Sequence, residues 1–232
     1  MYKIQGVLFD KDGTLFDFNA TWGNWTERLI ETETAGRPAE RARLARILGY
    51  DLEGHAFLPA SIVIAETVAT LASHVLPFTS DSDLHALIDR MSALSETAPQ
   101  VEATPLRPFA DTLKSMDLKV GLATNDSESA ARAHLARAGV LDAFDFVAGY
   151  DSGHGAKPAP GPLLAFGRSV GLEPQDCAMI GDSLHDLHAG KAAGFTTVGV
   201  LTGPARREAL APHADVVLDS IAELPAWIAG HS

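Results

Sequence analysis

The sequence predicts an α/β fold in which a parallel sheet is covered by helices and interrupted near its start by a helical insertion. From about residue 106 onward, short apolar segments alternate with amphipathic helical ones, which is typical of a parallel sheet with helices on both faces. Between about residues 19 and 103, Ala, Leu, Glu and Arg recur at helical spacing and strand-like alternation is absent.

The first predicted element is a buried parallel strand, because the run Ile4-Gln5-Gly6-Val7-Leu8-Phe9 is largely apolar and Gly13 allows a sharp turn soon after it. Five more strands are predicted, near Val120, Phe146, Met179, Val198 and Val217. Helices are predicted after most of the strands. The helix over residues 127–137 is well marked, since the capping residues Asn125, Asp126 and Ser127 open it and Gly139 ends it.

The position of the insertion predicts two domains. Residues 1–18 and 104–232 would form the sheet-containing core, and residues 19–103 would form the helical insertion. Pro105 and Pro108 on one side, and the turn region at Gly13 on the other, mark the passages between the two. Because the insertion directly follows the first strand, we expect it to lie over the carboxyl edge of the sheet as a lid.

Composition and charge restrict the possible partners. A chain of 232 residues is long enough for a core domain with a smaller insertion. The formal net charge of -12 argues against binding of nucleic acid, so we expect a small-molecule partner. No run is long and apolar enough to span a bilayer, so no membrane partner is expected. The sequence leaves the oligomeric state open.

Two features predict a cytoplasmic location. The predicted first strand begins within four residues of the amino terminus, which leaves no room for a signal peptide. The chain has a single cysteine, Cys177, and therefore no internal disulfide, which fits a reducing compartment. Because Cys177 stands just before a predicted buried strand, we expect a packed thiol rather than a reactive one.

Two carboxylates, Asp10 and Asp12, follow the first strand one residue apart. They would lie at the carboxyl edge of the sheet, where α/β folds bind ligands. Carboxylates this close repel each other, so keeping both ionised requires a bound cation or a shared proton. A hard dication such as Mg²⁺ suits an all-oxygen ligand set, and the sequence therefore predicts a magnesium site.

Three further motifs follow in order. The first is the strand-like run 119–123 followed by Thr124-Asn125-Asp126, and the second is the segment 155–160, which contains Lys157. The third is the run 178–181 followed by Asp182, with Asp186 four residues later. Together with DKDGTLFD at residues 10–17, they resemble the four signatures of the haloacid dehalogenase-like hydrolase superfamily, closest to its phosphoglycolate phosphatase-like branch. Each motif alone would be ordinary turn and cap chemistry, but their joint order is not. The resemblance covers essentially the whole chain and implies a Rossmann-like core with an all-helical cap.

The resemblance also implies a role for each residue in a phosphatase. Asp10 would attack phosphorus to give an aspartyl-phosphate, and Asp12 would act as the acid and base. Thr124 and Asn125 would bind phosphate oxygens. Lys157 would stabilise the phosphate and keep Asp10 ionised.

The metal site implied by the resemblance holds Mg²⁺ through Asp10, Asp12 and Asp182. Asp186 would orient a metal-bound water or Lys157. His185 and His188 stand beside these acids in the sequence and could suggest a transition metal. The carboxylates make the site hard, so the two histidines are better interpreted as surface or second-shell groups.

The expected activity is hydrolysis of a small phosphomonoester, with phosphoglycolate as the leading candidate. Dehalogenases of the superfamily lack the second acid, so Asp12 argues against dehalogenation. The phosphonate-cleaving relatives need a lysine in the cap, and no lysine stands between Lys11 and Lys114. Two alternatives stay open: a sugar phosphomutase, which shares all four signatures, and a catalytically silent regulator that binds a phosphorylated metabolite.

Four residues have more than one interpretation. Lys11 stands where the branch usually has an apolar residue, and it could tune the site or extend outward. Trp22 and Arg28 share a face with Trp25 at helical spacing, and could form an aromatic wall and an anion anchor or simply pack within the cap. His154 could touch the substrate or lie in a solvated loop.

Overall fold

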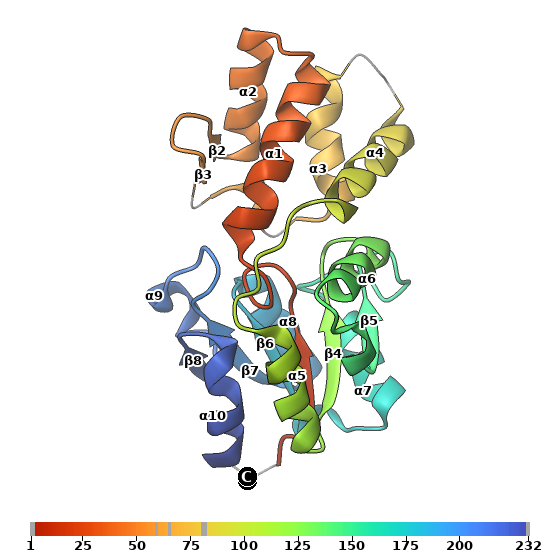
Figure 1. Cartoon of the computed structure of the whole chain (residues 1–232), viewed down its shortest axis with the longest axis vertical. Helices are drawn as coiled ribbons and strands as arrows, with labels where there is room; N and C mark the ends of the chain where they lie inside the picture. The colour runs from red at the N-terminus through yellow and green to blue at the C-terminus, as the bar shows by residue number, and fades with distance from the viewer. Residues whose placement is uncertain (1–2, 59, 65, 80–82, 231–232) are drawn as a thin grey trace.

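A six-stranded parallel sheet forms the core of the chain, in the order β5-β4-β1-β6-β7-β8 (Figure 1). The structure is a computed structural model that describes residues 3–58, 60–64, 66–79 and 83–230. The strands are β1 (Gly6–Phe9), β4 (Lys119–Ala123), β5 (Phe146–Ala148), β6 (Cys177–Gly181), β7 (Thr196–Val200) and β8 (Val216–Leu218). All six strands expected from the sequence are therefore present, and they form the Rossmann-like core that the resemblance implies.

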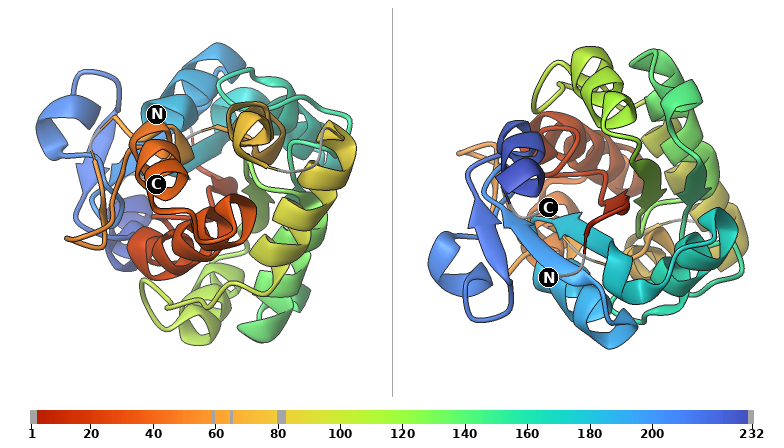
Figure 2. Two further views of the ribbon diagram at one scale, coloured as in Figure 1. Left: turned by 90° about the horizontal axis from the view of Figure 1, so that it is seen from above. Right: turned by 90° about the horizontal axis from the view of Figure 1, so that it is seen from below.

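Helices cover both faces of this sheet, as the view from below shows (Figure 2). One face carries α5 (Leu106–Ser115), α6 (Glu128–Arg137) and α10 (Leu224–Gly230), and the other carries α7 (Gly161–Val170) and α8 (Leu184–Ala193). A one-turn helix, α9 (Arg207–Leu210), precedes β8. Successive side chains of β1 alternate between the faces, with Val7 and Phe9 in one hydrophobic cluster and Leu8 in the other.

The predicted helix after β4 is confirmed as α6. The side chain of Ser127 caps it by accepting a hydrogen bond from the backbone N–H of Ala130 at 3.2 Å. Gly139 follows its end with φ +67°, a conformation that glycine adopts readily. Of the three predicted capping residues, Ser127 therefore caps the helix, while the side chain of Asn125 bonds the backbone of Lys157.

The segment between β1 and α5 is mainly helical. Its helices are α1 (Phe18–Thr34), α2 (Pro38–Leu48), α3 (Val68–Val75) and α4 (Leu84–Glu96), with 3₁₀ turns at Ile62–Ile64 and Leu76–Phe78. It departs from an all-helical insertion by one antiparallel hairpin, β2 (Tyr50–Asp51) with β3 (Ala56–Phe57). Each of these strands has only two residues, which is too short for the alternation that reveals a strand in a sequence.

The hydrophobic clusters divide along the same line. The buried cluster of the insertion runs from Phe18 to Met91 and centres on residues such as Trp25 and Leu44. The two clusters that flank the sheet contain no described residue between 19 and 103. Each part of the chain therefore has apolar packing of its own.

The chain enters and leaves the insertion through two segments that pair with each other. The backbone N–H of Asp17 donates to the carbonyl of Val101 at 2.8 Å, and that of Ala103 donates to Leu15 at 2.9 Å. The insertion stands beyond the carboxyl ends of the strands and, seen from above, covers them (Figures 1 and 2). None of the described helices has the length and low polarity that a membrane span requires.

Candidate active site

The parallel register gathers the polar motifs at one edge of the sheet. Phe9, the last residue of β1, pairs with Leu122 on one side and with Ile180 on the other. Asp10, Thr124 and Asp182 follow these strands, so they emerge side by side. Six of the seven predicted site residues line a cavity of about 40 Å³ under the insertion, together with Phe18, Trp22, Val63, Ile64, Val68 and Leu71: Asp10, Asp12, Thr124, Asn125, Lys157 and Asp186. The seventh, Asp182, is not among the lining residues but lies beside Asp10 and Asp186.

Three carboxylates meet at this edge: Asp10, Asp182 and Asp186 each offer an oxygen, and these oxygens lie within 4.8 Å of one another. Burial raises the pKa of Asp10 to about 7, with Lys157 opposing the rise and Asp186 adding to it. Burial also raises the pKa of Asp182 well above its usual range, and the charge of Asp10 adds to this. Such a buried, all-oxygen cluster favours a hard divalent cation.

Lys157 is the cation that faces this cluster. Its Nζ lies 2.6 Å from Oδ1 of Asp10 and 2.6 Å from Oδ1 of Asp186. Burial alone would lower the pKa of Lys157, but the two carboxylates more than offset it, so the pKa is raised and the group stays charged. Asn125 fixes the lysine backbone, because its side chain accepts from the Lys157 N–H and donates to the Lys157 carbonyl, both at 2.9 Å.

Asp186 has a second function within its own helix. Its Oδ2 accepts hydrogen bonds from the backbone N–H of Ser183 at 3.0 Å and from the Ser183 hydroxyl at 2.6 Å, which closes a capping box at the start of α8. Both carboxylate oxygens are therefore occupied, one by the helix cap and one by Lys157. Asp186 therefore ties Lys157 to the start of α8.

Asp12 lies apart from the acidic cluster. Its Oδ2 is 2.8 Å from Nζ of Lys11, and the Lys11 side chain is 0% exposed. Lys11 therefore does not extend outward, and of its two interpretations the outward one is wrong. Burial raises the pKa of Asp12, while the positive charge of Lys11 opposes the rise.

The loop after β1 requires glycine at position 13. Gly13 has φ +83°, and a Cβ atom there would collide with the carboxylate of Asp182. Thr14 donates a hydrogen bond to Asp182 Oδ1 at 3.4 Å, and Thr202 donates to the Gly13 carbonyl at 2.6 Å. The loop that carries Asp10 and Asp12 is thus packed directly against Asp182.

The remaining candidates separate into those that face the cavity and those that do not. Trp22 lines it and packs edge-on against Trp25, which is 1% exposed within the helical cluster. Arg28 is exposed and does not line the cavity, which argues against its use as an anion anchor. His154 is also exposed, and its ring stacks on Phe146 with the ring centroids 6.1 Å apart.

His185, His188 and Cys177 lie outside the acidic cluster. His185 lines the cavity, whereas His188 contacts His213 at 3.2 Å on the surface. Among the residues the structure describes, the cluster that could hold a metal contains no histidine. Cys177 is fully buried and burial raises its pKa to about 12, which confirms the packed thiol.

Two residues near the site were not assigned a role there from the sequence. Asp126 and His134 are buried and lie 3.0 and 2.9 Å from the Lys11 ammonium. His134 does carry a signal in the sequence, since it follows Ala130 and Ala131 at helical spacing and so lies on the apolar face of its helix. A polar residue on such a face needs a buried partner.

Comparisons with known proteins agree with this geometry. The haloacid dehalogenase-like hydrolase family model matches residues 4–194. The chain is 32% identical to the phosphoglycolate phosphatase of Shigella boydii, with 99% of this chain and 94% of the relative covered. It is 30% identical to that of Rhodospirillum rubrum, with 97% and 90% covered.

A solved structure shows the same fold. The crystal structure of a predicted phosphoglycolate phosphatase from Haemophilus somnus superposes with a TM-score of 0.76 at 17% identity, covering 98% of this chain and 99% of the other. The four motifs, their meeting at one sheet edge and these matches lead to one assignment. The chain belongs to the haloacid dehalogenase-like hydrolase family, in its phosphoglycolate phosphatase-like branch, and is a phosphoric monoester hydrolase.

Proposed function

We propose that the protein is a Mg²⁺-dependent phosphatase that hydrolyses a small phosphomonoester through an aspartyl-phosphate on Asp10. The observation that carries this proposal is the contact of Asp10 with Lys157 at the mouth of an acidic cluster, inside a cavity lined by the other motif residues. A lysine beside a buried carboxylate favours its ionised form and fixes its position, which is what a nucleophile needs.

Asp10 would form and then lose a bond to phosphorus. Lys157 holds its Oδ1, which leaves Oδ2 to attack the phosphorus atom as the bond to the leaving oxygen breaks. Water then attacks the same phosphorus atom, and inorganic phosphate is released with the Asp10 carboxylate restored. Asp12 would protonate the leaving oxygen in the first step and take a proton from the water in the second.

Thr124 and Asn125 would bind the phosphate oxygens. Oγ1 of Thr124 accepts the N–H of Asp126 at 3.1 Å, so its hydroxyl hydrogen can be donated to a phosphate oxygen. The Asn125 side chain already clamps the backbone of Lys157, so its contribution to phosphate binding would come from its backbone. Lys157 adds the positive charge.

Mg²⁺ would be held by Asp10 and Asp182, with Asp12 contributing its backbone carbonyl oxygen, because its Oδ2 contacts Lys11 and its other carboxylate oxygen is needed for proton transfer. When bound, the ion supplies positive charge that neutralises the phosphate. Asp186 would act by orienting Lys157. The raised pKa values of Asp10 and Asp182 support a cation here, because both groups are costly to keep ionised without one.

Phosphoglycolate is the first substrate to test, since it is the substrate named for the relatives, and the small cavity suits a compact molecule. The apolar side chains that the insertion contributes would exclude water around it. We propose the cytoplasm as its compartment, where a single buried cysteine needs no disulfide partner.

Replacement of the nucleophile tests the mechanism. Asp10→Asn should lower kcat by about 10³-fold or more, because an amide is nearly isosteric but a poor nucleophile. Turnover would be measured with 4-nitrophenyl phosphate and Mg²⁺, with the fold checked by circular dichroism. Asp111→Asn, the same change at an exposed residue of α5, is the control. Wild-type turnover in an Asp10→Asn sample free of deamidation would refute the aspartyl-phosphate.

The same assay separates the other functions. A phosphatase releases inorganic phosphate from its substrate, whereas a sugar phosphomutase isomerises a sugar phosphate faster than phosphate appears. A silent regulator would bind a phosphorylated metabolite without turning it over.

The acid role predicts a dependence on the leaving group. Asp12→Asn should lower kcat for alkyl phosphates by about 10²–10⁴-fold, because an alkoxide needs a proton to depart. The loss of kcat for aryl phosphates should be smaller. Steady-state rates on phosphoglycolate and 4-nitrophenyl phosphate measure this. Equal losses on the two substrates would contradict leaving-group protonation.

Variants of Asp182 and Lys157 should lose activity in different ways. Asp182→Ala should raise the Mg²⁺ concentration needed for half-maximal activity by at least about 10-fold, since it removes a proposed ligand. Lys157→Ala should be nearly inactive at every Mg²⁺ concentration, because the lysine acts on Asp10 and phosphate. Magnesium titrations of both variants distinguish these effects, and recovery of Lys157→Ala at high Mg²⁺ would contradict its assignment.

We also propose that residues 19–103 form a cap domain that selects the substrate, with residues 1–18 and 104–232 as the catalytic core. The proposal is supported by the separate hydrophobic clusters, the paired linkers and the cavity between the two parts. The linkers at residues 15–19 and 103–108 would act as the hinge, with Pro105 and Pro108 limiting their conformations.

Removal of the cap tests this division. When residues 20–102 are replaced by a short linker, the core should stay folded, because its hydrophobic clusters contain no described residue of that segment. Discrimination among natural phosphates should disappear, while some activity on 4-nitrophenyl phosphate remains. Cooperative unfolding and a panel of phosphates would be measured. An unchanged substrate ranking in the folded, uncapped protein would refute the cap assignment.

A further inference from the structure

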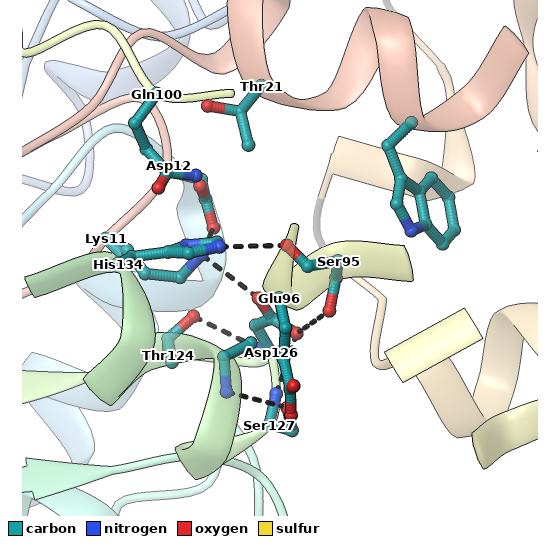
Figure 3. A network of polar contacts seen from close by, with 12 residues as sticks. Lys11, Asp12, Thr21, Ser95, Glu96, Gln100, Thr124, Asp126, Ser127 and His134 are labelled. Carbon is teal, nitrogen blue, oxygen red and sulfur yellow. Dashed lines mark hydrogen bonds and ion pairs between the residues drawn. The ribbon is translucent and has the colours of Figure 1, made fainter. Parts of the chain in front are cut away.

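Lys11 is a buried charge to which the mechanism above assigns no task. It stands between Asp10 and Asp12 in the sequence, and its side chain is 0% exposed. A lysine is rarely buried completely unless it is paired, because its charge loses the stabilisation of water. Its surroundings, shown in Figure 3, must therefore replace that stabilisation.

Three polar atoms lie within 3.0 Å of the ammonium, two of them in ion pairs and one in a hydrogen bond. They are Oδ2 of Asp12 at 2.8 Å, Oδ2 of Asp126 at 3.0 Å and Nδ1 of His134 at 2.9 Å. Burial alone would lower the pKa of Lys11, but the two carboxylates more than offset it and the pKa is raised. The lysine is therefore charged, and its direction is fixed.

The contact with His134 defines the tautomer of the imidazole. Nε2 of His134 lies 2.8 Å from the backbone carbonyl of Ser95, which can only accept, so Nε2 carries the hydrogen. Nδ1 then has a lone pair to accept a hydrogen from Lys11. Burial, together with the charge of Lys11, lowers the pKa of His134 to about 3, which keeps the ring neutral.

Asp126 is held as firmly on the other side. Its Oδ1 accepts from the backbone N–H of Ser127 at 2.8 Å and from the hydroxyl of Ser95 at 3.3 Å (Figure 3). Its negative charge offsets part of the effect of Lys11 on Asp12. Trp22 of the insertion lies over the ammonium, 5.5 Å from Nζ to the ring centroid.

The contacts of Lys11 determine how the carboxylate of Asp12 is held. Its Oδ2 is held by Lys11. Its Oδ1 is buried, and among the described residues only the Trp22 indole approaches the carboxylate as a further donor, while the residue lines the cavity. We propose that Lys11, anchored by Asp126 and His134, is a positioning residue that holds one oxygen of Asp12 so that the other faces the leaving group. This rests on the proposed acid role of Asp12.

The test uses Lys11→Met, which keeps the length of the side chain and removes its charge. kcat on phosphoglycolate should fall by about 10- to 100-fold, part of the full acid contribution, while kcat on 4-nitrophenyl phosphate falls less than about 3-fold. KM for both substrates should stay within about 3-fold, since no phosphate contact is lost. Lys119→Met, at a lysine whose side chain is 51% exposed, is the matched control and should behave as wild type.

A second variant covers the case in which Lys11→Met does not fold, since it leaves two buried carboxylates without a cation. The double variant Lys11→Met with Asp126→Asn removes both charges of the pair and should show the same selective loss. Equal losses on the two substrates, which leave the ratio of their rates as in the wild type, or no loss on either, would overturn the positioning role.

Asp12→Asn, measured in parallel, separates this inference from the proposed function. If Asp12→Asn shows the selective loss and the folded lysine variants do not, only the positioning role of Lys11 fails. If Asp12→Asn itself shows equal losses on both substrates, the acid role fails and the positioning role fails with it.

Discussion

The pair of ion contacts made by Lys157 is the interaction on which the acidic edge of the sheet depends. One ammonium touches Asp10 and Asp186 at 2.6 Å each, while a third buried carboxylate, Asp182, stands beside them. One positive charge beside three carboxylates leaves an excess of negative charge, which only a bound proton or a cation can neutralise. The loop after β1, the capping box of α8 and the hydrogen bonds of Asn125 to the Lys157 backbone hold these charged groups in position.

Much of the fold follows from local patterns in the sequence. The six strands are visible as apolar runs, and their parallel arrangement brings the residues after β1, β4 and β6 to one edge without further information. The predicted residues Asp10, Thr124 and Asn125 come together for this reason, while Lys157 reaches them from the loop before α7. The hairpin β2–β3 was missed because a two-residue strand has no period.

The network around Lys11 could not be predicted in the same way. The lysine contacts His134, which is 123 residues away in the chain, and His134 contacts Ser95 in the insertion. Such contacts depend on how α4 and α6 meet, which is a property of tertiary packing rather than of spacing. A lysine in a loop is ordinarily solvated, so only the packed structure shows that this one is enclosed.

The carbonyl and hydroxyl of Ser95 have a consequence for how the insertion can move. They complete the enclosure of a charged lysine, so separating α4 from α6 would admit water to a buried ammonium and break its alignment. If the insertion moves about its linkers as proposed, its opening is coupled to the alignment of Lys11, because moving α4 away from α6 would release the residues that hold the lysine.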